Sequence, residues 1–309
     1  MSTFVSIGNG TQSFARLLDR VAEIADELPQ PVVVQYGNTP FSCAKTRNVA
    51  FIDEAEYNRL LAACTLFITH GGGGSVFSAL RLGKKPVVIA RLKAFAEHVD
   101  DHQIALVEEL AQQGLIHPLR NEADLSEVVA LAIADPVNPE RLEENSEAIA
   151  RIKRAIDDFA PAGGKVLLVC PSGGHLAEIR ALRQCYRDRP HFYAMNTPII
   201  EPPDMQGRTQ IITLSQRDWK FLVNLHEAWS IIRREKPRVI LTTGGGFSVA
   251  FTLVGKLLGV KTVYVETVGK VNVPTATGKI MYHLAERFFY QWPYLKTYFP
   301  KGEYVGLIL

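Results

Sequence analysis

The sequence predicts an α/β protein of two domains, each built on a parallel β-sheet. Its 309 residues suit two domains of about 150 residues each. Apolar strands alternate with amphipathic helices along the chain, which is the pattern of parallel sheets. A strand that runs into a glycine loop and then a helix occurs at matching places in both halves. We therefore expect two Rossmann-like domains of similar layout.

Composition excludes several classes of protein. Hydrophobic residues make up 47% and charged residues 21% of the chain, so disordered, collagen-like and coiled-coil proteins are excluded. The longest uncharged stretch of note, residues 239–255, is shorter than the roughly 20 apolar residues of a membrane-spanning helix. We expect no signal peptide. Four cysteines without a CxxC pair are typical of a reducing compartment and carry no metal signature.

Charge is distributed unevenly between the halves. Residues 1–160 carry 15 Lys and Arg against 22 Asp and Glu, whereas residues 161–309 carry 19 against 10. A basic half favours an anionic partner. We expect a peripheral protein on the anionic cytoplasmic face of the cell membrane, with no nucleic-acid partner.

The first half begins with the apolar strand Phe4–Ile7, the loop Gly8-Asn9-Gly10 and an amphipathic helix over residues 13–28. A strand follows at residues 32–34. The strand Leu66–His70 then runs into four glycines and Ser75, and a further helix and strand end at Ala90.

The second half repeats this order. The strand 165–170 leads through Pro171-Ser172-Gly173-Gly174-His175 into a helix over residues 176–186. The strand 239–243 leads into the glycines 244–246, a helix and the strand 261–265. Proline and glycine clusters at 135–139 and 161–164 predict domains at 1–137 and 165–309, joined by a segment at 138–164. The helix expected over residues 140–159 packs along the contact between domains or is a plain spacer.

Glycine loops between a parallel strand and a helix favour diphosphates, because backbone N–H groups and the helix N-terminus face the ligand. The sequence holds neither a GxGxxG fingerprint nor a GxxxxGK[ST] loop, which disfavours dehydrogenases and ordinary NTPases. A single glycine loop is often only a tight turn. Four glycine loops at equivalent places in two domains indicate two diphosphate sites, one for a donor and one for an acceptor.

A polar cluster at residues 97–103 begins a predicted helix at residues 103–113. Carboxylates and an amide there suit sugar hydroxyls, although Asp100 or Asp101 could simply cap the helix. His98 and His102 stand at i, i+4 spacing, but no third ligand is placed nearby, so we expect no metal.

These motifs resemble a known pair of proteins. "THGGGGS" and "EHVDDHQ" resemble the catalytic subunit of the two-subunit N-acetylglucosaminyltransferase that builds dolichol-linked oligosaccharides. "PSGGH", "TTGGG", "VETVGKV", "TGKIMYHLAERFFYQWP" and "YVGLIL" resemble its membrane-anchoring partner subunit. The pair is similar to bacterial exopolysaccharide and capsule transferases that use UDP-glucuronic acid or UDP-galactose. Both halves are more distantly similar to the transferase that adds N-acetylglucosamine to lipid I.

The resemblance covers nearly the whole chain and implies the GT-B fold, with two Rossmann-like domains facing across a cleft. It implies an inverting, metal-independent UDP-sugar glycosyltransferase without a cofactor, here with the donor half first. The resembled partner subunit usually begins with a membrane anchor, and we expect no counterpart of it in this fused order. The implied donor-binding residues are Gly8, Asn9, Gly10, Gln35, His70, Gly72, Gly73, Gly74, Ser75, Arg91, Glu97, His98, Asp101 and Gln103.

The acceptor implied is a polyprenyl-diphosphate-linked saccharide, bound by Ser172, Gly173, Gly174, Gly245 and Gly246. Inverting transfer needs one base. His175 is the first candidate, with phosphate binding as its alternative role, and Glu266 is the second candidate base.

Three further expectations follow. Arg91 and Lys93 precede the polar cluster, and a uronic acid carboxylate would suit Arg91, so glucuronic acid is the expected sugar, with N-acetylglucosamine or galactose as alternatives. An interfacial helix, or alternatively core packing, is expected for the apolar side chains Trp219, Phe221, Leu222, Leu225 and Trp229, which Arg233 and Arg234 follow. The final segment 304–309 packs against the first domain.

Two functions from other classes stay open: a non-catalytic UDP-sugar-binding regulator of a polysaccharide complex, and a UDP-sugar epimerase.

Overall fold

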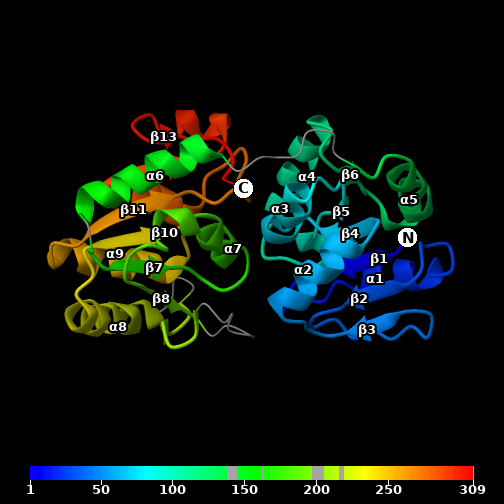
Figure 1. Cartoon of the computed structure of the whole chain (residues 1–309), viewed down its shortest axis with the longest axis horizontal. Helices are drawn as coiled ribbons and strands as arrows, with labels where there is room; N and C mark the ends of the chain where they lie inside the picture. The colour runs from blue at the N-terminus through cyan, green and yellow to red at the C-terminus, as the bar shows by residue number, and fades with distance from the viewer. Residues whose placement is uncertain (138–144, 162, 197–204, 216–218, 309) are drawn as a thin grey trace. The chain divides into compact units, whose positions relative to one another are not determined.

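A computed structural model describes the chain except residues 138–144, 162, 197–204, 216–218 and 309. It divides into two compact units, Met1–Glu143 and Glu144–Leu309 (Figure 1). Each unit holds one parallel sheet with helices packed on it. The predicted α/β class with two Rossmann-like sheets is confirmed.

The first unit contains a six-stranded parallel sheet in the order β3-β2-β1-β4-β5-β6. Its apolar strands pair in register, with Val5 opposite both Val34 and Ile68. Its elements are β1 (Thr3–Ser6), α1 (Ala15–Glu23), β2 (Val32–Gln35), β3 (Arg47–Val49), α2 (Glu54–Ala63), β4 (Leu66–His70), α3 (Gly73–Arg81), β5 (Val87–Ile89), α4 (His102–Gln112), β6 (His117–Pro118) and α5 (Leu125–Ala134).

The second unit contains a seven-stranded parallel sheet in the order β13-β12-β11-β10-β7-β8-β9. Its elements are α6 (Ser146–Phe159), β7 (Val166–Val169), α7 (Gly174–Ala181), β8 (His191–Met195), β9 (Thr209–Ile211), α8 (Lys220–Glu235), β10 (Val239–Thr242), α9 (Gly246–Leu257), β11 (Lys261–Val265), α10 (Ala276–Leu284), β12 (Arg287–Tyr290) and β13 (Glu303–Tyr304).

The strands of the second sheet are buried on both faces. Val166 and Leu168 pack with α6, whereas Leu167 and Val169 pack with α8 and α9. This explains why the strands read as continuous apolar runs. Figure 1 shows α6 and α8 on opposite sides of this sheet.

Both sheets reverse their strand order at a corresponding place. The reversal lies between β1 and β4 in the first unit and between β7 and β10 in the second. Ligands of such sheets bind beyond the carboxyl ends of the strands at this switch point. The four predicted glycine loops follow these four strands, so the topology brings them together in pairs.

The helix α6 packs on the second unit. Asn145 caps its start, and Ile149, Ile152 and Ile156 are buried in the core that includes β7, β10 and β11. The structure therefore divides the chain after Glu143 and makes this helix part of the second unit, rather than a separate linking element.

The C-terminal segment also packs on the second unit. Val305 and Ile308 are buried in the same core as α6, and Asn145 Nδ2 donates to Val305 O at 2.9 Å. Ile308 N donates to Gln291 Oε1 at 2.8 Å. Val305 and Ile308 therefore anchor this segment in the second unit, Tyr304 is 45% exposed, and Leu309 lies outside the described residues.

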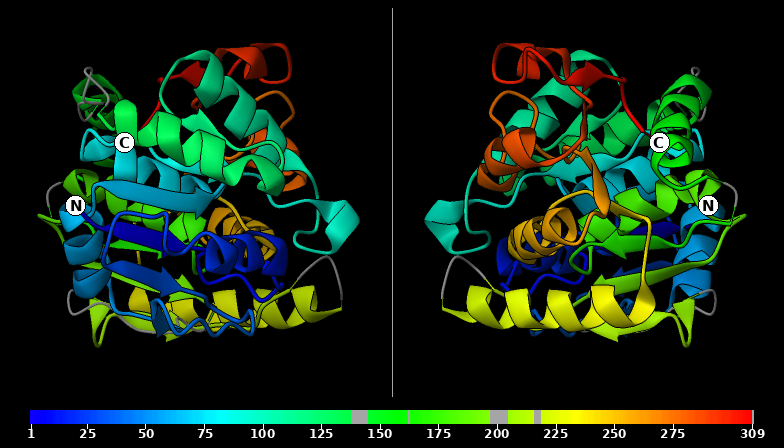
Figure 2. Two further views of the ribbon diagram at one scale, coloured as in Figure 1. Left: turned by 90° about the vertical axis from the view of Figure 1, so that its right-hand side faces the viewer. Right: turned by 90° about the vertical axis from the view of Figure 1, so that its left-hand side faces the viewer.

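Among the described helices, none is both long and apolar enough to cross a bilayer. The helix α8 runs as one continuous helix, as both views of Figure 2 show. Asn224, Ala228, Ile231 and Ile232 form its buried face. Trp219, Leu222 and Trp229 are 73%, 67% and 38% exposed, so core packing does not explain these three side chains.

Candidate active site

At the switch point of the first unit, the ring of His70 lies between the two glycine loops. A Cβ added to Gly8 would lie 2.7 Å from His70 Cε1, and one added to Gly72 would lie 2.3 Å from His70 Nε2. Gly8 also has a φ of +73°, which favours glycine. Both glycines are therefore needed to let the loops close around this imidazole.

The His70 ring is neutral at physiological pH. Burial, and next the Arg91 guanidinium, lower its pKa to about 3. A neutral imidazole offers one donor and one acceptor nitrogen. His70 therefore adds no cation to this site.

The helix α3 begins at this switch point. Gly72 is its N-cap residue, and no described side chain caps the helix. Gly72, Gly73, Gly74 and Ser75 are partly accessible, and Asn9 and Gly10 opposite are exposed. An uncapped helix start of this kind suits a phosphate group, because its backbone N–H groups and the helix dipole favour an anion.

Gln35 does not reach a ligand as predicted. Its side chain is 2% exposed, and Oε1 accepts from Ser6 Oγ at 2.8 Å. Its Nε2 donates to Gly8 O at 3.1 Å and to Ala50 O at 3.0 Å. Because the amide is fully used, Gln35 holds the Gly8 loop in place instead of contacting a ligand.

Arg91 was wrongly predicted to bind the sugar. Its side chain is 3% exposed, and Nη1 donates to Gln12 O at 3.0 Å and Glu97 O at 3.2 Å. Its Nη2 donates to Ile7 O at 2.8 Å. Burial lowers the pKa of the guanidinium to about 10, so it stays charged at neutral pH. Arg91 therefore joins the segments that contain Ile7, Gln12 and Glu97. The two N–H groups that could bind a uronic acid carboxylate are already used by these carbonyl groups.

Glu97 was also wrongly assigned to the sugar. Its carboxylate is buried, and Arg16 Nε donates to Oε1 at 2.8 Å while Arg16 Nη2 donates to Oε2 at 3.0 Å. Leu92 N donates to Oε2 as well. Both oxygens are therefore used inside the unit.

The remaining residues of the polar cluster divide into two groups. Gln103 is buried, and its Oε1 accepts from Arg91 N at 3.0 Å. Asp101 is exposed and does not cap α4, since its Oδ1 accepts from Lys93 N at 2.7 Å. Asp101 and the partly exposed His98 stay accessible to a sugar.

The structure adds Asp100 to the two histidines considered for a metal. Ligand atoms of His98, Asp100 and His102 lie within 4.8 Å of one another. The His102 ring bonds to the Asp100 carboxylate, and His98 Nδ1 lies 3.3 Å from it. This group brings three possible ligand atoms together, and the His102 ring and the Asp100 carboxylate also bond to each other. The sequence analysis missed the third ligand.

At the switch point of the second unit, the two glycine loops touch each other. A Cβ on Gly244 would lie 3.1 Å from His175 Cε1, and one on Gly245 would lie 2.5 Å from Pro171 Cγ. Both glycines have positive φ values, +124° and +93°. The β10 loop can therefore lie against the His175 loop only because these positions lack side chains.

The helices α7 and α9 begin here, and no described side chain caps either start. Their N-cap residues are Gly173 and Gly245. Ser172 is fixed by Asn196, whose Oδ1 accepts from Ser172 N at 2.9 Å. Gly173 and Gly174 are exposed, and His175 is partly exposed. Two adjacent uncapped helix starts with an imidazole between them suit a diphosphate and a proton acceptor.

Glu266 does not fit the role of base. Its side chain is fully buried, with Tyr264 Oη and Thr275 N each donating at 2.8 Å to one carboxylate oxygen. A Cβ on Gly278 would lie 1.9 Å from Glu266 Oε2, so the first turn of α10 closes over the carboxyl group. Burial raises its pKa. Glu266 anchors α10 and has no face open to substrate.

The sequence analysis missed Glu178, one turn after His175 on α7. Thr267 Oγ1 donates to its Oε1 at 2.6 Å, and Val268 N donates to the same oxygen at 3.3 Å. Burial raises the pKa of this carboxyl group to about 8. The sequence feature that could have pointed to it is its position on the same helix, three residues after the candidate base His175.

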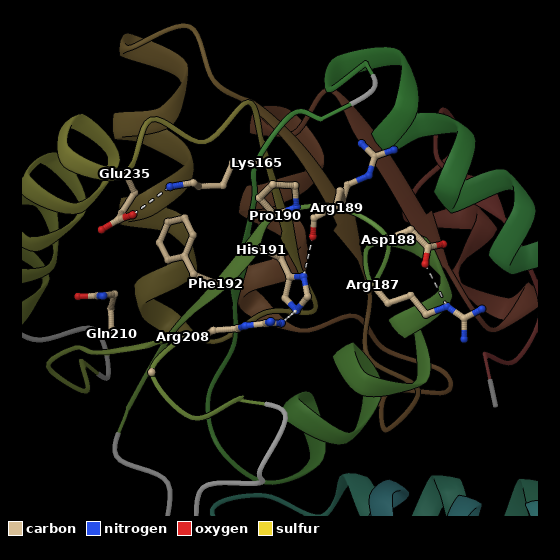
Figure 3. A pocket seen from close by; sticks show the side chains of 11 residues that line it. Lys165, Arg187, Asp188, Arg189, Pro190, His191, Phe192, Arg208, Gln210 and Glu235 are labelled. Atoms are coloured by element: carbon tan, nitrogen blue, oxygen red, sulfur yellow. Dashed lines mark hydrogen bonds and ion pairs between the residues drawn. The ribbon is translucent and has the colours of Figure 1, made fainter.

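A hollow of about 650 Å³ lies elsewhere, at the amino-terminal ends of β7 and β8 (Figure 3). Its cations are held by other groups: Lys165 bonds to Glu235, Arg189 to Asp157, and Arg208 to the His191 ring. Because it lies away from the carboxyl ends of the strands, this hollow is separate from the candidate site.

Comparison with protein families matches both parts of the chain. Residues 4–159 match the glycosyltransferase family 28 C-terminal domain, and residues 205–308 match the Alg14-like oligosaccharide biosynthesis proteins. The subunit ALG14 of the UDP-N-acetylglucosamine transferase from Yarrowia lipolytica is 31% identical over 47% of this chain and 81% of its own length.

The chain belongs to both families. The human subunit ALG14 is 29% identical over 51% of this chain and 89% of its own length. The ALG13 subunit from Yarrowia lipolytica is 40% identical over 25% of this chain and 41% of its own length. The family 28 match includes α6, so it extends past the boundary between the two units.

Similarity to solved structures is weak. The UDP-GlcNAc 2-epimerase from Methanocaldococcus jannaschii is 10% identical over 92% of this chain and 88% of its own chain, with a TM-score of 0.22. A likeness at this level carries no argument about function.

Proposed function

We propose that this protein is an inverting glycosyltransferase that moves N-acetylglucosamine from UDP-N-acetylglucosamine to a polyprenyl-diphosphate-linked saccharide. One observation carries the proposal: each sheet has its switch point at a pair of glycine loops with an uncapped helix start. Two sites for diphosphates in one chain suit a nucleotide-sugar donor and a lipid-diphosphate acceptor.

The choice of sugar rests on the relatives, which are named as UDP-N-acetylglucosamine transferase subunits. The expectation of glucuronic acid depended on Arg91, whose guanidinium is used by backbone carbonyls. N-acetylglucosamine is neutral, so unlike a uronic acid it needs no cation to bind the sugar itself. UDP-glucuronic acid and UDP-galactose become the competing donors in the test.

The donor belongs to the first unit in this proposal. The N–H groups of Gly73, Gly74 and Ser75 bind the diphosphate and stabilise the leaving UDP. Asn9 and Gly10 cover the diphosphate from the opposite loop, and Asp101 and His98 bind sugar hydroxyls.

The second unit binds the acceptor and supplies the base. Gly173, Gly174, Gly245 and Gly246 bind the lipid diphosphate through their amides. His175 takes the proton from the acceptor hydroxyl as its oxygen attacks the anomeric carbon. The bond between that carbon and the diphosphate breaks, and UDP leaves with the electron pair.

The test is a donor screen that measures UDP release with a synthetic prenyl-diphosphate N-acetylglucosamine. We expect release from UDP-N-acetylglucosamine that requires the acceptor. Acceptor-independent conversion of the sugar would favour an epimerase, and UDP binding without turnover would favour a regulator.

A matched pair of histidine variants tests the base. His175→Ala should lower kcat by about a hundred- to ten-thousand-fold while UDP affinity stays unchanged. His283→Ala, an exposed histidine on α10, is the control and should keep full turnover. If His175→Ala stays within a few-fold of the parent, His175 binds phosphate or is not part of the site.

A further inference from the structure

The first turn of α7, which carries His175, is held from two sides. Thr243 Oγ1, after β10, donates to His175 O at 3.1 Å. On the other side, Thr267 and Val268, after β11, donate to the carboxyl group of Glu178. Thr267 Oγ1 also accepts from Gly269 N at 3.3 Å, which fixes its hydroxyl group. The segment after β11 therefore forms hydrogen bonds with the helix of His175 through the side chain of Glu178.

The second oxygen of Glu178 has an unusual environment. Its Oε2 is enclosed and forms no hydrogen bond with any described part of the chain. A buried polar atom without a partner is costly, and such atoms in native proteins call for an explanation. The other oxygen, Oε1, accepts from both Thr267 Oγ1 and Val268 N, so the carboxyl group is held on one side only.

We propose that Glu178 is a positioning residue, whose carboxyl group ties α7 to the segment after β11 and so sets the place of the His175 imidazole. This inference rests on the proposed function, in which His175 is the base. Glu178 itself does not touch the reacting atoms. Its effect passes through the backbone of α7 to a side chain one turn earlier.

The groups around Glu178 explain its protonation state. Glu266 and Tyr264 of the β11 segment and Cys170 at the end of β7 interact with it, and Lys270 lies near Glu266. Burial, and also the Glu266 charge, raise the pKa of Glu178 to about 8. The carboxyl group is therefore mainly uncharged at pH 7, and its ionisation above pH 8 places a negative charge on α7 one turn after His175.

Two substitutions of Glu178 separate the effect of its hydrogen bonds to Thr267 and Val268 from the effect of its negative charge. Glu178→Gln keeps an oxygen that accepts from Thr267 and Val268 and stays neutral at all pH values. Glu178→Ala removes the tie. The matched control is Glu286, whose carboxylate accepts from Thr262 N at 2.8 Å at the opposite end of β11. Glu286→Ala removes a comparable hydrogen bond far from His175.

The first measurement is the ¹H–¹⁵N spectrum of the histidine rings, with His175 assigned by its absence in His175→Ala. We expect its ring signals to shift in Glu178→Ala and to keep their positions in Glu178→Gln and Glu286→Ala. Raising the pH from 7 to 9 should shift them in the parent and not in Glu178→Gln. Unchanged signals in a folded Glu178→Ala overturn the proposal, as does the same pH response in the parent and in Glu178→Gln.

The second measurement is turnover. Glu178→Ala should lower kcat by about 10- to 100-fold, since small misplacements of a catalytic group cost this much, with the KM for the donor unchanged. In the parent, kcat should fall above pH 8 as Glu178 ionises. Glu178→Gln should have the parent's kcat at pH 7 and should not show this fall. A kcat for Glu178→Ala within three-fold of the parent overturns the proposal. A parent enzyme that releases no UDP contradicts the proposed function instead, and the ring spectra still decide on the tie.

Discussion

Glu97 shows how a residue suited to sugar binding can have another role. Its carboxylate forms a buried, bidentate pair with Arg16 and also accepts from Leu92 N. We expect Glu97→Ala to lower the free energy of unfolding of the first unit by about 1–3 kcal/mol, because the Arg16 guanidinium loses its bidentate partner and keeps only its bonds to Glu122 and Ala90 O. Urea denaturation measures this. Asp101→Ala, at an exposed position, should change stability little, and a stable Glu97→Ala with altered donor preference would contradict this role.

His70 gives a pH dependence with a definite sign. Its pKa is about 3 in the folded chain and near 6.5 when unfolded, so the unfolded state binds an extra proton between these values. Stability from the neutral ring is complete above pH 6.5 and decreases as pH falls towards 3. His70→Asn should therefore lose less stability than the parent between pH 7 and pH 4. Parallel stability curves for the two proteins would contradict this.

The sequence predicted the residue types at the site better than their roles. Gly72–Ser75 and His175 lie at the switch points, as their strand–glycine–helix pattern implied. Gln35, Arg91 and Glu266 lie at the carboxyl ends of their strands and Glu97 in the loop that follows β5, but hydrogen bonds within each unit use their polar groups. Several of those bonds join residues far apart in sequence, such as Arg91 and Ile7, and a local pattern does not report them.

At the scale of elements, the glycine loops make a clear contrast. Gly245 has a φ of +93° and lies against Pro171, whereas Gly174 has open space where its Cβ would be. Gly245→Ala should destabilise the protein by about 1–2 kcal/mol or more through backbone strain, and Gly174→Ala should cost well under that. Thermal unfolding of the two variants checks this, and equal stabilities would contradict the packing of these loops.

The exposed face of α8 is the element suited to a membrane surface. Trp219, Leu222 and Trp229 are exposed, and Arg233 lies 5.4 Å from the Trp229 ring. We expect Trp219→Ala with Leu222→Ala to weaken flotation with anionic liposomes, and high salt to weaken it in the parent. Phe95→Ala, which removes a 59% exposed side chain of the first unit, is the control. Unchanged flotation of the double variant would exclude this face.

Element boundaries explain other differences from the sequence analysis. The helix expected over residues 176–186 ends at Ala181, and that expected over 13–28 covers Ala15–Glu23. The apolar stripe correctly predicted a helix with one buried face, which begins at Ser146, while residues 140–144 of the expected helix lie outside the described residues. Its partner could not be predicted, because an apolar face fits any apolar surface and the contact with β7, β10 and β11 depends on the whole second unit.

At the scale of the whole molecule, two sheets repeat one topology and place glycine loops at both switch points. Two strands in each half, each followed by a glycine loop, were enough to predict this repeat. The short edge strands β3, β6 and β13 could not be predicted, since two or three residues give no periodicity. The assignment of donor to the first unit and acceptor to the second is the central claim.

Hydrogen exchange with and without UDP tests that claim most directly. We expect UDP to slow exchange at the amides of residues 8–10 and 72–75, because the diphosphate accepts hydrogen bonds from the α3 start. The amides of residues 173–175 and 244–246 should exchange at unchanged rates. Protection of the second pair of loops by UDP, or none at residues 72–75, would contradict the assignment.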